Sequence, residues 1–110
     1  MYKRQAWVCL HHCPIDVGSL WLDAVGLDDG YDLLMLTQRF PRVRAILCGH
    51  VHQELDTVVH GVRLLASPST CYQFKPGSKR FTLDEMPPGY RSLRLFPDGH
   101  IESRVSRVKD

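Results

Sequence analysis

Apolar residues in the first half of the chain follow the periods of strands and of a helix. Two continuous apolar runs, 6–10 and 43–48, predict buried strands, because a strand covered on both faces is apolar at nearly every position. Between them, apolar positions three and four apart over 31–40 predict an amphipathic helix. We expect Asp32 to cap its start and Pro41 to end it. Strand, helix and strand in this order indicate an α/β fold.

The second half of the chain predicts short antiparallel strands separated by turn residues. The expected pairs are 54–59 with 62–66 around His60-Gly61, 70–74 with 81–83 around Pro76-Gly77, and 90–96 with 101–105 around Asp98-Gly99. The predicted fold class is therefore α/β with a mixed sheet and antiparallel hairpins. This order of elements is more typical of half of a two-sheet sandwich than of a closed domain.

Composition narrows the functional classes. The chain has 110 residues, 44% hydrophobic and 24% charged, which suits one ordinary domain with a modest core. A net charge of +2 without a long basic run argues against nucleic-acid binding. No apolar run reaches the ~18 residues of a membrane span, and no signal peptide precedes Trp7, so a cytoplasmic location is expected. Solvated positions on a sheet face are expected for Arg91, Arg94, Arg104 and Arg107.

Four cysteines without a Cys-x-x-Cys motif predict reduced and mostly buried thiols rather than a disulfide framework. Cys9 and Cys48 fall inside the two apolar runs. A zinc site made of Cys9, Cys13 and Cys48 is an alternative. It fits less well, because two of these thiols lie within strands rather than at their open ends.

Two groups of histidines follow the two apolar strands directly. They are His11-His12 and the pair in Gly49-His50-Val51-His52, and the carboxyl ends of strands are where open α/β sheets place their ligands. If the second segment is extended, His50 and His52 face the same side. Neutral imidazole is a common ligand of zinc and iron, so metal binding is one interpretation and ordinary polar loop histidines are the other.

Other polar residues give weaker signals. Ser69 and Thr70 offer hydroxyl groups, although a turn that satisfies its own backbone is the plainer interpretation. His60 and His100 lie in predicted turns and are expected to face solvent. The acidic residues of 16–29 lie in loop positions outside any recognisable ligand motif.

An ordered series of motifs runs through nearly the whole chain. It comprises His11-His12-x-Pro14, Trp21-Leu22-Asp23, Cys48-Gly49-His50-Val51-His52-Gln53-Glu54, Pro68-Ser69-Thr70-Cys71-x-Gln73-Phe74 and Pro88-Gly89-Tyr90-Arg91. The series resembles the C-terminal half of bacterial class III cyclic-AMP phosphodiesterases, a group of the calcineurin-like metallophosphoesterases. The Gly-His-x-His element is shared across that superfamily, whereas Pro-Ser-Thr-Cys-x-Gln-Phe is specific to the group.

The resemblance implies a four-layer αββα sandwich with two metal ions, iron, manganese or zinc. It implies that His50 and His52 each ligate one ion and are catalytic, that His11 is a further ligand with His12 as the fallback, and that metal-activated water hydrolyses a phosphodiester, cyclic AMP above all. His12, Ser69 and Thr70 are candidate substrate-binding residues on the same basis.

The resemblance also implies that 1–110 is one partial metallophosphoesterase domain. The family takes its other ligands from an N-terminal half with Asp-x-His, Gly-Asp and Gly-Asn-His motifs, which the ordered series does not include. A sheet without its covering layer exposes apolar surface, so a homo-oligomer or pairing with a separate N-terminal half is expected. The alternative function is a non-catalytic module that self-associates or binds a partner.

Overall fold

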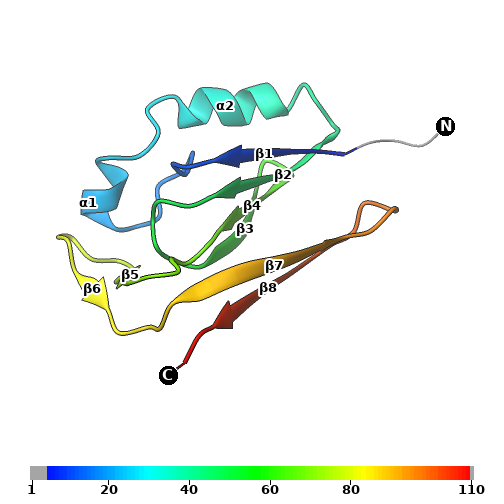
Figure 1. Cartoon of the computed structure of the whole chain (residues 1–110). Coiled ribbons are helices and arrows are strands. Elements are labelled where there is room, and N and C mark those ends of the chain that lie inside the picture. Colours follow the sequence, from blue (N-terminus) through cyan, green and yellow to red (C-terminus); the bar gives the residue numbers. More distant parts are fainter. Residues whose placement is uncertain (1–4, 110) are drawn as a thin grey trace.

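A computed structural model describes residues 5–109 and shows a four-stranded sheet with a helix on one face and a β-hairpin on the other (Figure 1). The elements in chain order are β1 (Ala6–Leu10), α1 (Leu20–Asp23), α2 (Gly30–Thr37), β2 (Val43–Cys48), β3 (Leu55–Val59), β4 (Val62–Ala66), β5 (Gln73–Phe74), β6 (Leu83–Asp84), β7 (Gly89–Leu95) and β8 (Ile101–Arg107). The α/β class and the mixed sheet predicted from the sequence are confirmed. No helix in this part of the chain is long and apolar enough to cross a membrane.

The main sheet has the strand order β1-β2-β4-β3. The first three strands are parallel, and β3 runs antiparallel to β4. Leu10 pairs with Cys48, and Cys48 pairs with Ala66, so these three strands end level with one another. The loops that follow β1, β2 and β4 therefore leave the sheet from the same edge.

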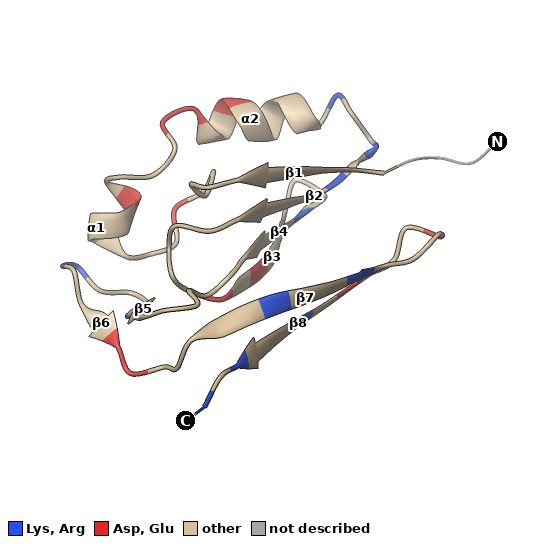
Figure 2. Ribbon diagram, in the orientation of Figure 1, with Lys and Arg blue, Asp and Glu red and all other residues tan. Residues whose placement is uncertain are grey.

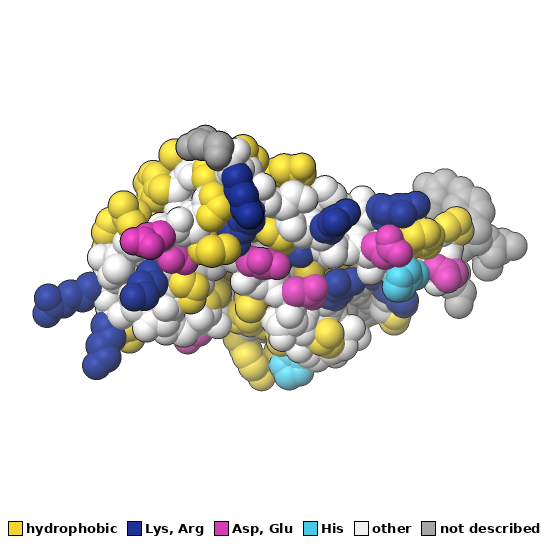
Figure 3. All heavy atoms as spheres, turned by 90° about the horizontal axis from the view of Figure 1, so that it is seen from below, with side chains coloured by type: hydrophobic (Ala, Val, Ile, Leu, Met, Phe, Trp, Pro, Cys, Tyr) yellow, Lys and Arg dark blue, Asp and Glu magenta, His cyan; other side chains and the backbone are white. Residues whose placement is uncertain are grey.

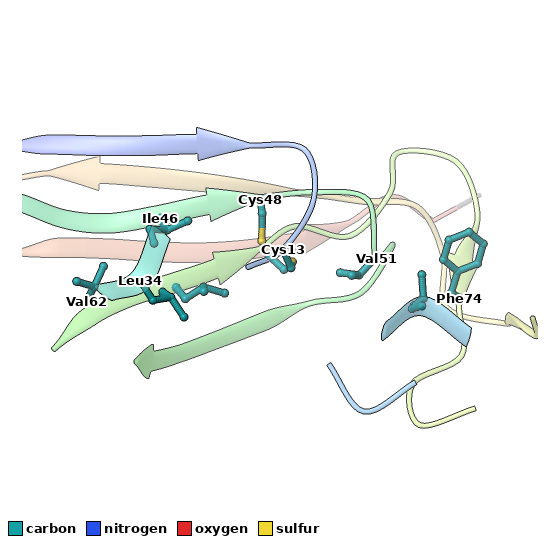
Figure 4. Packing of buried hydrophobic residues seen from close by; sticks show 10 residues of the cluster. Cys13, Leu34, Ile46, Cys48, Val51, Val62 and Phe74 are labelled. Atoms are coloured by element: carbon teal, nitrogen blue, oxygen red, sulfur yellow. The ribbon is translucent and has the colours of Figure 1, made fainter. Parts of the chain in front are cut away.

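Alternate residues of the sheet strands build a core beneath α2. Ile46 and Cys48 of β2 and Leu64 of β4 belong to one buried cluster, which Leu34 of α2 joins (Figure 4). Ile46 and Leu64 are at most 1% exposed. Burying a side chain of this size contributes about 1.5–3 kcal/mol to folding, so this layer is the main apolar support of the sheet.

The helix α2 differs from the sequence prediction at both ends. Its N-cap is Asp29, whose side chain makes no capping hydrogen bond, and Asp32 lies inside the first turn, so the predicted cap was wrong. The helix ends at Thr37, and Phe40 beyond it is 54% exposed. Gly30 begins the helix against the loop after β1, where a Cβ would lie 2.2 Å from the Pro14 carbonyl oxygen. Close approach to that loop, rather than a side-chain cap, therefore sets the start of the helix.

The hairpin β7–β8 crosses the sheet face opposite α2 (Figure 1). The Arg91 guanidinium donates hydrogen bonds to the carbonyl oxygens of Leu55, at 3.1 Å, and Ala66, at 2.8 Å. Arg63 of β4 donates to the carbonyl oxygen of Ile101 at 2.7 Å and also pairs with Asp56, whose pKa it holds below the ordinary value. Charged side chains from both layers thus fasten the hairpin to the backbone of the sheet.

Two of the four arginines expected on a solvated face are partly buried instead. Arg91 lies between the layers, where burial lowers the pKa of its guanidinium while Asp56 and Glu54 favour its charged form. The Arg107 side chain is 17% exposed and donates to the Pro87 carbonyl oxygen. Arg94 and Arg104 are exposed as predicted. Strand periodicity alone did not show which hairpin face meets the sheet.

The predicted hairpins of the second half are confirmed at β3–β4 and β7–β8, and β5–β6 is shorter than expected. The segment before β5 is a turn rather than a strand. The Ser69 hydroxyl accepts a hydrogen bond from the Cys71 amide at 2.9 Å, and the Gln73 side chain bonds both the amide and the carbonyl of Ser69. These local bonds satisfy the backbone and leave only Gln73 and Phe74 for pairing.

The hairpin side of the molecule mixes exposed apolar and charged side chains. Figure 3 shows hydrophobic side chains interspersed with acidic and basic ones on this face, and Lys and Arg side chains projecting from the end that carries β5 and β6. Exposed large hydrophobic residues on the hairpin and the β5–β6 region include Tyr72, Phe81, Leu83, Met86, Tyr90 and Leu95.

The docking of the hairpin can be tested by Arg91→Ala. Hydrogen bonds from a charged group contribute about 1.5–3 kcal/mol, so the substitution is expected to lower the free energy of unfolding by about 2–3 kcal/mol. The measurement is urea unfolding followed by tryptophan fluorescence.

The matched control is Arg94→Ala on the same strand. Arg94 makes a 3.6 Å ion pair with Glu102 and its side chain is 75% exposed, so a loss of about 0.5 kcal/mol or less is expected. Equal losses for both variants would contradict the assigned role of Arg91.

Candidate functional site

Three imidazole rings gather at the edge where β1 and β2 end. The ring centres of His12 and His50 lie 4.2 Å apart, those of His11 and His50 5.1 Å apart, and those of His11 and His12 5.0 Å apart. The parallel pairing of Leu10 with Cys48 brings the two loops together. As expected, the two strands are neighbours in the sheet, and the two histidine groups lie close together.

His50 is a half-buried member of this cluster. Its Nε2 atom is buried and has no hydrogen-bond partner within residues 5–109. Burial, followed by the charges of His12, His11 and His52, lowers the pKa of His50, so its neutral form is favoured. A neutral imidazole with a free, desolvated nitrogen is the form that binds a metal ion.

His52 lies in a different setting from His50, contrary to the expectation for an extended segment. Both residues have positive φ, 66° and 49°, and the Val51 amide donates to the Gly49 carbonyl oxygen at 2.7 Å. The segment is therefore tightly turned, with Val51 only 3% exposed. Because the backbone turns, the two imidazoles do not project in parallel from one strand.

Aromatic residues of the β5 region fix the His52 ring. The ring stacks on Phe74 at 4.1 Å with an interplanar angle of 7°. His52 Nδ1 lies 2.9 Å from the Tyr72 carbonyl oxygen, which can only accept, so Nδ1 carries the proton. Metal-binding histidines are commonly held in this way, with one ring nitrogen donating to a backbone carbonyl and the other left as the ligand.

These histidines fit a metal site only in part. Within residues 5–109, no group of three or more His, Cys, Asp or Glu side chains is arranged so that it could hold a metal ion. The unpartnered Nε2 of His50 and the tautomer of His52 suit ligands, while no carboxylate of residues 5–109 joins them in a metal-binding group, as charge balance for a pair of ions requires. His12 is nearer to His50 than His11 is, and His11 is exposed.

Nearby polar residues have structural partners. Asp23 accepts hydrogen bonds from the amides of Val17, at 2.8 Å, and Gly18, at 3.2 Å, and so shapes the loop after β1. The Ser69 hydroxyl serves the turn before β5, and Thr70 is exposed. The turn interpretation of this segment is thus supported, and a binding role for these hydroxyls stays a prediction.

The remaining histidines lie at the opposite end of the strands. His60 and His100 are exposed, as expected, and both line an open hollow of about 670 Å³ between the β3–β4 turn and the tip of the β7–β8 hairpin. Asp98 and His100 form an Asp-x-His sequence, but the Asp98 carboxylate accepts from the His100 amide in a turn. Basic and acidic residues both occur at each end of the molecule (Figure 2).

The four cysteines are free, and they divide into two pairs. Cys13 and Cys48 are buried, whereas Cys9 and Cys71 are exposed, so the prediction of a buried Cys9 was wrong. Cys9 sits on the sheet face turned away from the α2 core, and a three-cysteine zinc site is not formed among the described residues. The side-chain contact between Cys13 and Cys48 lowers the pKa of Cys13 and raises that of Cys48.

The fold and the histidine cluster together define an α/β domain with a histidine-lined edge at the carboxyl ends of parallel strands. Comparison with known proteins narrows the class of protein further. No protein-family model matches the chain. It is 52% identical over 108 residues to the 3',5'-cyclic adenosine monophosphate phosphodiesterase CpdA of Pseudomonas aeruginosa, covering 98% of this chain and 40% of that protein. Identity to CpdA of Escherichia coli is 46% over 108 residues, with 98% and 39% covered.

A cyanobacterial relative extends the set. The 3',5'-cyclic-nucleotide phosphodiesterase of Nostoc sp. is 41% identical over 101 residues, which are 92% of this chain and 38% of that protein. The chain is thus a partial homologue of the bacterial CpdA cyclic-AMP phosphodiesterases, and the resemblance stated from the motifs is confirmed. It spans about 40% of the length of the curated relatives that it matches.

The tautomer of His52 gives a direct test of the site geometry. At about pH 8.5, where imidazole is neutral, His52 is expected to carry its proton on Nδ1. Long-range ¹H–¹⁵N correlation spectra of the ring nitrogens measure this. Exposed His60 is the control and is expected to show the averaged tautomers of a solvated ring. A proton on Nε2 of His52 would contradict the hydrogen bond to Tyr72.

Proposed function

We propose that this chain is the histidine-bearing, C-terminal part of a metal-dependent phosphodiesterase that acts on a cyclic nucleotide, cyclic AMP above all. The observation that carries the proposal is 52% identity to CpdA of Pseudomonas aeruginosa over 98% of this chain. The clustering of His11, His12 and His50 at one sheet edge supports it independently. The proposed architecture of the complete protein is the calcineurin-like four-layer αββα sandwich, of which residues 1–110 form part of one domain.

In this proposal His11, His50 and His52 are metal ligands, with His12 as the alternative to His11. Bound iron, manganese or zinc would polarise the phosphoryl oxygens and lower the pKa of a bound water. His50 offers its buried Nε2, and His52 is held by Phe74 and the Tyr72 carbonyl so that its Nε2 is left for the ion. Rigid support of this kind keeps ligands in place without a reorganisation cost.

The surroundings of the cluster suit an anionic substrate. Lys75, Lys79 and Arg80 lie on the connection between β5 and β6, at the same end of the sheet as the histidines, and all three are exposed. Positive charge at this end raises the local concentration of a phosphodiester. The His12 imidazole is closer to His50 than that of His11, so His12 is the first candidate for substrate contact, followed by Ser69 and Thr70.

The remaining ligands have to come from outside the described residues. The proposal assigns them to a carboxylate-bearing part of the sandwich that the matched segment of the relatives does not include. That part is supplied by the same polypeptide, by a separate chain, or by a second copy. The chain by itself is therefore expected to be a poor catalyst.

A second candidate function is a non-catalytic module that self-associates or binds a partner. Two observations favour it: no group within residues 5–109 could hold a metal ion as it stands, and large apolar side chains are exposed on the hairpin and β5–β6 region. The two candidates differ in what they require of His50. The enzyme needs its imidazole, whereas the module does not.

A chimera separates these candidates. The segment of the Pseudomonas aeruginosa CpdA that this chain matches is replaced by residues 1–110, which restores a full-length relative. If the histidines are competent ligands, the folded chimera is expected to hydrolyse cyclic AMP in added manganese. His50→Ala is then expected to lower kcat/KM by more than about 100-fold, because even outer partners of metal ligands are worth 10–100-fold.

The matched control in the chimera is His60→Ala, which removes an exposed imidazole at the opposite end of the sheet. Its activity is expected to stay unchanged. A chimera that melts cooperatively but hydrolyses no cyclic AMP would overturn the enzymatic proposal and leave the binding module. Equal effects of the two substitutions would show that His50 is not a ligand.

A further inference from the structure

We infer that Cys13 and Cys48 form a reversible disulfide that links the two histidine segments of the candidate site. Cys13 directly follows His11-His12, and Cys48 directly precedes Gly49-His50. A bond between the two sulfurs would therefore join the loop after β1 to the end of β2. The inference concerns the thiols alone and does not depend on the proposed phosphodiesterase activity.

The two thiols lie together in the structure. Cys13 is 4% exposed and Cys48 3% exposed, and both belong to the cluster beneath α2. The Cys13 thiol donates to the carbonyl oxygen of Gly49, the residue after Cys48, at 3.8 Å. Figure 4 shows Cys48 pointing from the end of its strand toward Cys13 in the neighbouring loop.

Cys13 and Cys48 have no other assigned role among the described residues. The thiols are not part of a group that could hold a metal ion. Cys9 is exposed on the other face of β1, and Cys71 is exposed in the turn before β5. Because Cys13 and Cys48 lie in one buried cluster while Cys9 and Cys71 are exposed elsewhere, the high effective concentration of the buried pair favours one intramolecular bond over the other pairings.

Hydrogen peroxide or a disulfide-exchange reagent supplies the oxidant. With peroxide, one thiolate sulfur attacks the peroxide oxygen, breaks the O–O bond and becomes a sulfenic acid, with water as the product. The second sulfur attacks this sulfenic sulfur and expels a second water. In sum the two thiols lose two protons and two electrons, and the peroxide becomes two waters. A dithiol reverses the bond by exchange through a mixed disulfide.

The bond has a structural consequence for the site. Cys13 lies next to His12, and Cys48 is two residues before His50, so the disulfide would restrain the two loops that bring these rings to 4.2 Å. Apolar burial makes both thiols slow to react until the loop after β1 opens. A resolving partner in contact protects the first sulfenic acid from further oxidation.

The test uses the full chain with Cys9→Ser and Cys71→Ser, which removes the exposed thiols and leaves only the pair. This choice matters because trypsin leaves Cys9 and Cys13 in one peptide, residues 5–39, while Cys48 falls in residues 45–63. After peroxide at neutral pH and alkylation, mass spectrometry is expected to show these two peptides joined and two hydrogens lighter than their sum. Dithiothreitol is expected to release them with both thiols alkylatable.

The control adds Cys48→Ala to this variant. It is expected to accumulate sulfinic acid on Cys13, because no resolving thiol is in contact. Sulfinic acid on Cys13 in the variant that retains Cys48 would overturn the inference. Free thiols that persist in the native chain however long the peroxide treatment lasts would overturn it as well.

Discussion

The parallel pairing of β1 with β2 positions both the core and the candidate site. It sets Leu10 opposite Cys48, so the two loops that carry the histidines and the buried thiols leave the sheet side by side. A slip of one residue would turn the side chains of a strand to the other face. Ile46 and Cys48 would then leave the core beneath α2, which ties the register of the site to the apolar core.

Backbone strain is concentrated in the loop after β2. His50 and His52 have positive φ, which is uncommon for residues other than glycine, and buried Val51 anchors the segment between them. His60 also has positive φ, but it forms the two-residue β3–β4 turn with Gly61, where this geometry is usual. In the Gly49–His52 segment no such hairpin requires the strain. The strained backbone of this segment accompanies the placement of the two imidazoles in different environments.

Sequence patterns predicted the frame of the fold because apolar periodicity reports burial directly. The runs at 6–10 and 43–48 became β1 and β2, and turn residues located the β3–β4 and β7–β8 hairpins. The proximity of the two histidine groups could be predicted because each group directly follows an apolar strand. Residues whose role depends on another layer were missed. Arg91 looked like a surface residue because nothing local shows that its hairpin docks on the carbonyl groups of Leu55 and Ala66.

Local chemistry misled the sequence prediction in two further places. Asp32 is a residue type that often caps a helix, yet the helix begins earlier, at Gly30, which packs closely against the Pro14 carbonyl. The spacing of His50 and His52 suits one side of an extended strand, yet the segment turns. In both cases packing between segments distant in sequence outweighed a local preference, and the same packing brought Cys13 beside Cys48.

X-ray absorption at the zinc edge shows whether the histidines at the β1–β2 edge are metal ligands. The sample is the reduced chain with one equivalent of zinc. If the histidines are ligands, the spectrum is expected to show at least two imidazole nitrogens at about 2.0–2.1 Å, with light atoms completing the shell. His50→Ala should remove imidazole scattering that His60→Ala leaves in place. A shell of oxygens alone, or sulfur at about 2.3 Å from Cys13 and Cys48, would contradict it.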